Sequence, residues 1–124
     1  MKLLLDTQIV LWFLNGEKLS EKIQTIIQDG DNYVSVVSLW EVAIKMNINK
    51  LSFDGGFIAF RKLIEDNGFK IIPVKDEHMN GLFALPLYHR DPFDRLLIAT
   101  ALAENMTILT ADSDIKKYDV PCLW

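Results

Sequence analysis

The sequence of 124 residues is poor in the side chains that bind soft metal ions or cross-link chains. It holds one cysteine, Cys122, and two histidines, His78 and His89. A single cysteine cannot form an internal disulfide, which agrees with a reducing, cytoplasmic environment. Zinc sites built on cysteine are excluded, and two histidines far apart argue against a histidine site.

Long apolar runs and an excess of positive charge are also absent. No stretch approaches the ~18 to 20 consecutive apolar residues of a membrane span, and Asp6 interrupts MKLLL too early for a signal peptide. The net charge of −4 argues against broad, non-specific duplex binding. It does not exclude a nucleic-acid substrate, because a metal ion or a few arginines can supply positive charge locally.

The composition that remains is that of one globular domain over residues 1–124, with 50% hydrophobic and 24% charged residues. Its apolar patterns alternate between strands and helices. We expect strands at 2–6, 33–37, 69–74, 106–110 and 120–124. We expect helices at 7–16, 20–29, 38–49, 55–68, 75–85 and 91–105, with helical turns at 113–118. This alternation predicts an α/β fold, a short parallel sheet of four or five strands with helices on both faces.

Four acidic residues follow the expected strands or begin the expected helices. Asp6 ends the first strand, and Asp112 follows the strand MTILT by two residues. Glu41 lies in the first turn of the helix after YVSVV, and Asp94 in the first turn of the long apolar helix. In a parallel sheet these positions can meet at the carboxyl edge, where such folds bind ligands. Grouped carboxylates without cysteine or histidine favour Mg²⁺ or Mn²⁺, whose chemistry suits phosphodiester hydrolysis.

Each acid also has a local structural interpretation. Ser38 and Glu41 have the spacing of a capping box, and Glu41 with Lys45 that of a helix ion pair. Asp6 can cap the first helix, although an acid that ends a central strand is costly without a partner.

The remaining acids can be interpreted in the same way. Asp91 followed by Pro92 reads as an N-cap and the first helical residue, and Asp94 is favoured by the helix dipole. Asp112 or Asp114 can cap the turn at 113–118. The local interpretation, taken one acid at a time, is the simpler one for Glu41, Asp94 and Asp112.

Five segments together resemble a known family: LLLDTQIVLWFL, VSVVSLWEVAIK, LPLYHRDPFDRLLIATALAEN, ILTADSDIKKY and the closing LW. In this order and at this spacing they resemble the PIN-domain ribonucleases, in particular the VapC-type toxins of toxin–antitoxin pairs. The resemblance covers essentially the whole chain. It implies a PIN-like fold and a Mg²⁺- or Mn²⁺-dependent endoribonuclease that acts on single-stranded or loop RNA.

The resemblance also implies roles for individual residues. Asp6, Glu41, Asp94 and Asp112 correspond to the metal-binding and catalytic acids, and Thr110 to a hydroxyl residue near the site. Asp91 remains an N-cap, and Asp114 is a possible accessory acid. A small antitoxin protein and a homodimer are implied as partners. Position 8 is Gln, where relatives of this branch often have His.

Several neighbouring side chains are open to two interpretations. His89, Arg90, Arg95 and Lys45 can contact RNA or form a solvated surface, and only for Arg95 do we favour RNA. Trp12, Phe13 and Trp40 can stack on bases, but aromatic residues at helical spacing more often belong to a core or an interface.

Two other functions compete with the nuclease. An aspartate-nucleophile phosphatase needs a second Asp at position 8, where this chain has Gln8. A non-catalytic PIN-fold binding module, with its acids serving only as helix caps, remains the alternative.

Overall fold

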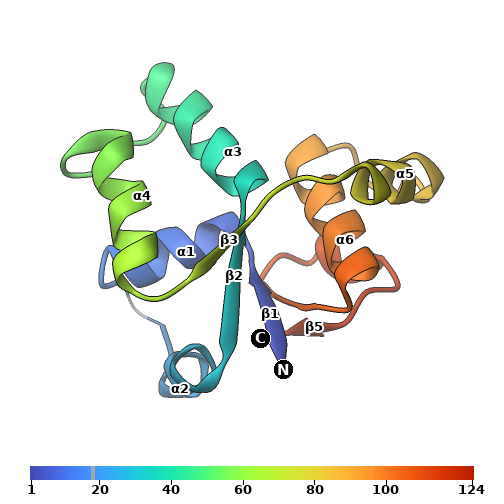
Figure 1. The fold of residues 1–124 in the computed structure, drawn as a ribbon, viewed down its shortest axis with the longest axis horizontal. Coiled ribbons are helices and arrows are strands. Elements are labelled where there is room, and N and C mark those ends of the chain that lie inside the picture. The colour runs from blue at the N-terminus through green and yellow to red at the C-terminus, as the bar shows by residue number, and fades with distance from the viewer. Residues whose placement is uncertain (18) are drawn as a thin grey trace.

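Five short strands alternate with helices in the computed structural model, which describes residues 1–17 and 19–124 (Figure 1). The strands are β1 (Lys2–Leu5), β2 (Asp31–Ser35), β3 (Lys70–Ile72), β4 (Thr107–Leu109) and β5 (Cys122–Leu123). The helices are α1 (Thr7–Leu14), α2 (Glu21–Asp29), α3 (Val36–Asn47), α4 (Gly56–Asp66), α5 (Asp76–Ala84) and α6 (Pro92–Glu104), and η1 (Ile115–Lys117) is a short 3₁₀ turn. No helix in the described ranges is long and apolar enough to cross a membrane.

All strands pair in parallel in the order β3-β2-β1-β4-β5, so β1 lies at the centre. The run LLL suits this place, because a central parallel strand is covered on both faces. The chain winds outward from β1 to β3 and returns to β4, which makes the gap between β1 and β4 the switch point of strand order. The predicted α/β fold, with its short parallel sheet, is confirmed.

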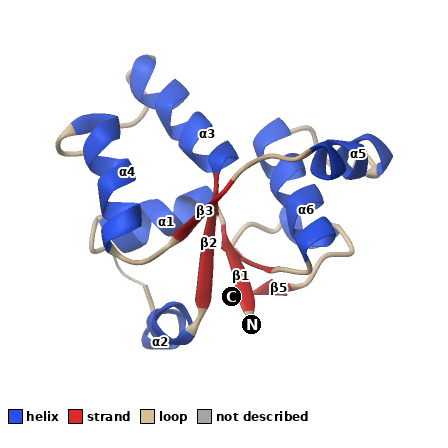
Figure 2. Cartoon of the chain, viewed as in Figure 1, coloured by secondary structure: helices blue, strands red, loops and turns tan. Residues whose placement is uncertain are grey.

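Helices cover both faces of the sheet (Figure 2). Leu3 and Leu5 point into a core formed with α1, α2, α3 and α4. Leu4 points the other way, into a second core with Ile108, α6 and η1. The alternation of successive side chains along β1 therefore joins two apolar layers.

The junction between β2 and α3 differs from the sequence-based prediction. The strand was expected to run to residue 37 and the helix to begin at Ser38, but α3 begins at Val36. Ser35 is the N-cap, and its hydroxyl accepts the backbone N–H of Val37 at 3.0 Å. The predicted capping box of Ser38 and Glu41 is therefore wrong. Ser38 is buried inside the helix, where its Oγ lies 2.7 Å from Thr7 Oγ1.

Helix α6 begins as the sequence predicts. The side chain of Asp91 accepts the backbone N–H groups of Phe93 and Asp94 at 2.9 and 3.0 Å, and Pro92 is the first helical residue. The residues at 97–101 are buried, but Leu102 is 44% exposed. The helix is therefore buried in its middle and exposed on part of its last turn, although the run LLIATALA is almost wholly apolar.

The N-cap at Ser35 makes a stability prediction. Replacement Ser35→Ala removes the acceptor of a buried N–H, so the free energy of unfolding should fall by about 1 kcal/mol. Urea unfolding measures it, with Ser52→Ala in an exposed loop as the control. Equal stability of the two variants would contradict the cap.

Candidate functional site

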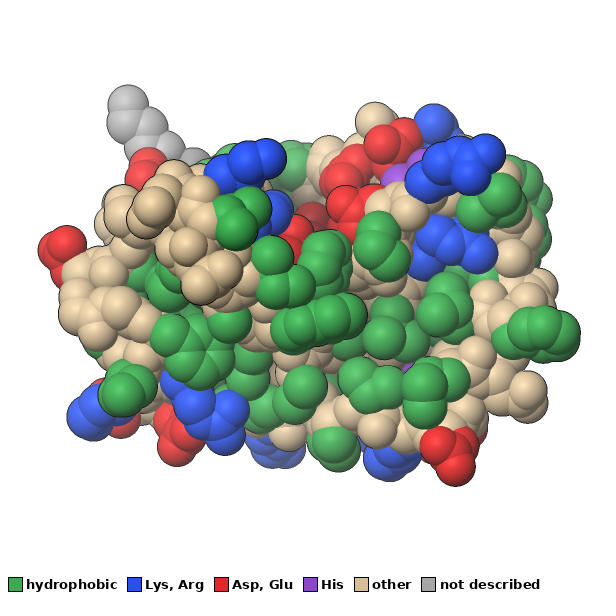
Figure 3. Space-filling view, turned by 90° about the horizontal axis from the view of Figure 1, so that it is seen from above, with side chains coloured by type: hydrophobic (Ala, Val, Ile, Leu, Met, Phe, Trp, Pro, Cys, Tyr) green, Lys and Arg blue, Asp and Glu red, His purple; other side chains and the backbone are tan. Residues whose placement is uncertain are grey.

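The four acids predicted from the sequence line one pocket of about 190 Å³ at the carboxyl edge of the sheet. We call it the acid pocket; its lining consists of Asp6, Thr7, Gln8, Leu11, Glu41, Lys45, Asp91, Asp94 and Asp112. Figure 3, seen from above, shows acidic side chains gathered in a hollow that apolar and basic side chains flank. Four segments far apart in the sequence thus contribute carboxylates to one place.

Asp6 lies where β1 ends, at the switch point. Its backbone N–H donates to Leu109 O at 3.1 Å, and its Oδ2 accepts the hydroxyl of Thr110 at 2.8 Å. Asp6 stands at the N-cap position of α1, as predicted, but its side chain makes no capping hydrogen bond to the helix. Burial raises the pKa of Asp6; the Thr110 hydrogen bond lowers it, Asp112 and Glu41 raise it, and the Thr7 backbone lowers it, with a net increase.

Asp112 combines a local role with its place in the pocket. Its Oδ1 accepts the backbone N–H of Asp114 at 2.8 Å, as an acid that begins a turn does. Its own N–H donates to Thr110 Oγ1 at 3.0 Å. Asp114 does not line the acid pocket and pairs with Lys117 at 2.7 Å. An accessory role for Asp114 therefore has no support in this geometry.

Glu41 reaches the pocket from the second turn of α3, one turn later than predicted. It is 8% exposed, and its Oε2 accepts the ammonium of Lys45 at 2.8 Å, which confirms the predicted ion pair. The hydrogen bond to Glu41 raises the pKa of Lys45, although desolvation opposes it. Lys45 is thus a cation held at the edge of an acidic pocket.

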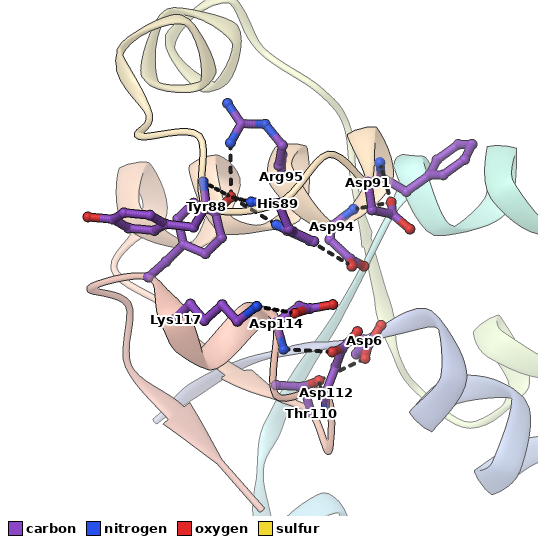
Figure 4. A network of polar contacts seen from close by, with 12 residues as sticks. Asp6, Tyr88, His89, Asp91, Asp94, Arg95, Thr110, Asp112, Asp114 and Lys117 are labelled. Carbon is purple, nitrogen blue, oxygen red and sulfur yellow. Dashed lines mark hydrogen bonds and ion pairs between the residues drawn. The ribbon is translucent and has the colours of Figure 1, made fainter.

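Asp94 lies in the first turn of α6, and its Oδ2 is 3.1 Å from His89 Nε2 (Figure 4). Burial raises the pKa of Asp94 to about 7. The hydrogen bond to His89 lowers it, and the charges of Asp91, Asp6 and Asp112 raise it further. Burial and mutual repulsion are the two conditions that a bound cation relieves.

A network beside Asp94 was not predicted from the sequence. His89 was interpreted as part of a solvated surface, but its side chain is only 11% exposed and lies between Asp94 and Tyr118. Desolvation lowers the pKa of His89, and hydrogen bonds to Tyr118 and Asp94 outweigh this, so the net pKa is raised. Tyr118, buried 29 residues further along the chain, had not been singled out. Only the adjacency of His89 to the DPFD segment offered a signal.

The prediction for Arg95 as an RNA contact does not fit its position. Its Nη1 donates to Pro86 O at 2.8 Å and to the Tyr118 hydroxyl at 2.9 Å. The guanidinium therefore anchors the loop before α6 and does not line the acid pocket.

The aromatic residues divide between packing and exposure. Trp12 lies 6.2 Å from Trp124 between ring centroids and lines a neighbouring pocket of about 280 Å³ that also contains Asp6 and Asp112. Phe13 packs on Phe69, as a core residue does. Trp40 is 57% exposed and contacts Phe93 edge to face.

A second group of possible metal ligands lies at α5 and α6, away from the acid pocket. In the part of the chain that is described, Glu77, His78 and Glu104 have ligand atoms within 4.8 Å of one another. His78 Nδ1 accepts the backbone N–H of Lys75, and its Nε2 lies 2.8 Å from Glu104. Because both ring nitrogens have protein partners, this buried histidine is a helix-capping residue.

Fold and site together define an α/β domain whose acids converge at the switch point of a parallel sheet. The PIN domain family model matches residues 3–121 of this chain. The chain therefore belongs to the PIN domain family, and the resemblance inferred from the sequence motifs is confirmed.

Solved structures share this fold over nearly the whole chain. The VapBC2 structure from Rickettsia felis, bound to a DNA fragment from the promoter, has a chain with 17% identity and a TM-score of 0.78, and the match covers 99% of this chain and 98% of that one. A chain of FitAcB from Neisseria gonorrhoeae has 18% identity and a TM-score of 0.72, and the match covers 98% of this chain and 96% of that one. A chain of VapBC-1 from nontypeable Haemophilus influenzae has 15% identity and a TM-score of 0.70, and the match covers 99% of this chain and 97% of that one. No curated protein matches the chain by sequence.

The raised pKa of Asp94 predicts how the metal-free protein responds to pH. Between the ordinary carboxyl pKa of 3.8 and about 7, the folded chain holds a proton on Asp94 that the unfolded chain has lost. This stabilisation is present below the lower value and is lost as pH rises through the upper one. In EDTA, the free energy of unfolding of the wild type should fall by roughly 1 kcal/mol more than that of Asp94→Asn between about pH 5 and about pH 8. This figure includes a reduction for solvent screening of the partly exposed carboxyl group.

Urea unfolding at the two pH values measures this difference. Asp114→Asn is the matched control, because Asp114 is bound to Lys117 and its pKa is lowered, outside that pH range. The control should keep the wild-type dependence. If Asp94→Asn keeps the pH dependence of the wild-type unfolding free energy, the pKa of Asp94 is not raised.

Proposed function

We propose that this PIN domain is a Mg²⁺- or Mn²⁺-dependent endoribonuclease and the toxin of a toxin–antitoxin pair. One observation carries the proposal: Asp6, Glu41, Asp94 and Asp112, from four separate segments, surround one pocket. A cluster of caps without a shared function has no need to converge. The likeness to chains of VapBC complexes supports the same branch of the family.

The residues of the acid pocket fit a hard divalent cation. The lining offers carboxylate oxygens and no sulfur or imidazole ligand. Mg²⁺ keeps several waters and is commonly held by one or two carboxylates, so a pocket with acids on several sides suits it. When bound, the metal would supply Lewis acidity toward water and the phosphate oxygens.

The chain's own residues would prepare the reaction in three ways. Thr110 holds one oxygen of Asp6, which leaves the other for the pocket. One of the pocket carboxylates would orient and deprotonate the attacking water. Lys45 can contact a phosphate group of an RNA strand bound at the pocket. In-line attack on phosphorus would leave a 5′-phosphate and a 3′-hydroxyl.

An exposed apolar stripe supports a protein partner. Val36, Trp40, Ile44 and Ile48 recur every fourth residue along α3 and its end, and each is more than a third exposed. A stripe of this kind is typical of a helix that packs against another chain. An antitoxin segment and a second copy of the chain are the two partners that the family suggests. The net charge of −4 makes a basic segment the better electrostatic match for the pocket side.

The nuclease proposal is tested by melting the chain and its Asp6→Asn variant in EDTA, Mg²⁺ and Mn²⁺. Metal should raise the melting temperature of the wild type, because a ligand of the folded state stabilises it. The same samples should cut a labelled single-stranded RNA only with wild-type protein and metal. Asp114→Asn, the matched acid outside the pocket, should behave as the wild type.

If neither metal nor RNA produces a response while Asp6→Asn only changes stability, the alternative holds. The chain would then be a non-catalytic binding module of the PIN fold, with acids that serve the local structure. The hydrogen bond from Asp114 N to Asp112 and the Glu41–Lys45 ion pair are the contacts that this alternative predicts.

The position of Lys45 leads to a prediction with two opposite effects. Lys45→Ala frees Glu41 from a competing cation, so Mn²⁺ should bind about threefold more tightly, as a partly exposed ion pair of about 0.7 kcal/mol implies. Affinity for single-stranded RNA should decrease, with a salt dependence shallower by about one phosphate contact. Calorimetry and filter binding measure the two. Weaker Mn²⁺ binding would contradict the competition.

A further inference from the structure

Asp94 is held by a chain of hydrogen bonds that runs through His89 to Tyr118. Its Oδ2 lies 3.1 Å from His89 Nε2, and His89 Nδ1 lies 2.8 Å from the hydroxyl of Tyr118. With the carboxylate ionised, Nε2 is the donor, so both nitrogens of the ring are engaged. The His89 ring also packs edge-on against the Tyr118 ring, with centroids 5.4 Å apart. The imidazole is therefore fixed in place and in rotation.

Tyr118 is in turn a fixed point. It is 4% exposed, and its hydroxyl oxygen also accepts the backbone N–H groups of Tyr88 and His89 at 3.3 and 3.2 Å. Arg95 Nη1 donates to the same oxygen at 2.9 Å and to Pro86 O at 2.8 Å. One phenol thus joins the C-terminal region of the chain to the loop before α6 and to α6 itself.

The desolvation of buried polar side chains in this network costs free energy, which suggests a role beyond holding the loop. Burying a polar group requires that its hydrogen bonds be satisfied. A loop can be held by backbone contacts alone, yet here a histidine side chain extends from the loop to a pocket carboxylate. Figure 4 shows His89 and Asp94 on one side of the site, facing Asp6, Thr110 and Asp112.

We propose that His89 and Tyr118 are positioning residues that hold Asp94 in the orientation in which it binds the metal ion. The inference rests on the proposed function. His89 occupies Oδ2 of Asp94, which leaves Oδ1 for the pocket, and Tyr118 keeps His89 at that place. This matches Thr110, whose hydroxyl occupies one oxygen of Asp6 on the facing side. Groups that hydrogen-bond to a metal ligand commonly affect metal affinity about 10- to 100-fold.

The experiment is a calorimetric titration of the full chain with Mn²⁺, together with its melting temperature in EDTA. His89→Ala should weaken Mn²⁺ binding about tenfold. His89→Gln should restore most of the affinity, because a glutamine amide can present an N–H at the position of Nε2. Tyr118→Phe keeps the ring but removes the anchor of His89, so it should weaken Mn²⁺ binding by less than His89→Ala.

Tyr88→Ala is the matched control. Tyr88 is in the same loop and its ring packs on Tyr118 with centroids 5.0 Å apart, but it does not line the acid pocket. It should lower the melting temperature and leave Mn²⁺ affinity unchanged. If His89→Ala and Tyr118→Phe behave in the same way as Tyr88→Ala, the network only holds the loop and the proposal is overturned.

Failure of the proposed function would look different. In that case the wild type itself, like Asp94→Asn, would not bind Mn²⁺. If the wild type binds Mn²⁺, Asp94→Asn loses it and His89→Ala retains it, the metal site stands and only the positioning role is wrong.

Discussion

The hydrogen bond from Thr110 to Asp6 joins the ends of β1 and β4, and the site depends on the place where these two strands meet. Parallel pairing brings Leu5 beside Leu109, so the residues that follow each strand emerge together. The chain changes direction across the sheet at this pair, which leaves the edge between them open. The second turn of α3 and the first turn of α6 close it from the sides with Glu41 and Asp94.

This arrangement concentrates negative charge that the protein only partly compensates. Burial and neighbouring acids raise the pKa of Asp6 and of Asp94. Lys45 and His89 each contact one pocket carboxylate, and the hydroxyl of Thr110 contacts a third. The remaining repulsion is the physical reason for proposing a cation, and the absence of sulfur or imidazole ligands in the lining is the reason for proposing a hard one.

Much of the site could be predicted from the sequence, because strand ends are readable. The alternation of strands and helices predicted the parallel sheet, and the acids after LLL (Asp6) and shortly after MTILT (Asp112) predicted which residues lie at its carboxyl edge. The N-cap at Asp91 was also readable, since Pro92 marks the first helical residue. The start of α3 was not, because SVVS offers two serines three residues apart and only packing selects Ser35 as the cap.

Contacts between distant segments set the limit of the sequence-based reasoning. Tyr118 meets His89 over 29 residues, and no local pattern links them. Arg95 was predicted to contact RNA because it neighbours Asp94 in the sequence. Successive side chains of a helix point in different directions, however. Its guanidinium therefore reaches the loop at Pro86 and not the pocket.

Anomalous X-ray diffraction from crystals of the chain soaked in Mn²⁺ tests directly whether the acid pocket binds a metal ion. We expect an anomalous peak in the acid pocket, with oxygen atoms of Asp6 and of at least one further pocket acid, Glu41, Asp94 or Asp112, around it. The group of Glu77, His78 and Glu104 offers an internal comparison in the same crystal. A peak there with none in the acid pocket, or no peak at all at saturating Mn²⁺, would contradict metal binding by the pocket acids.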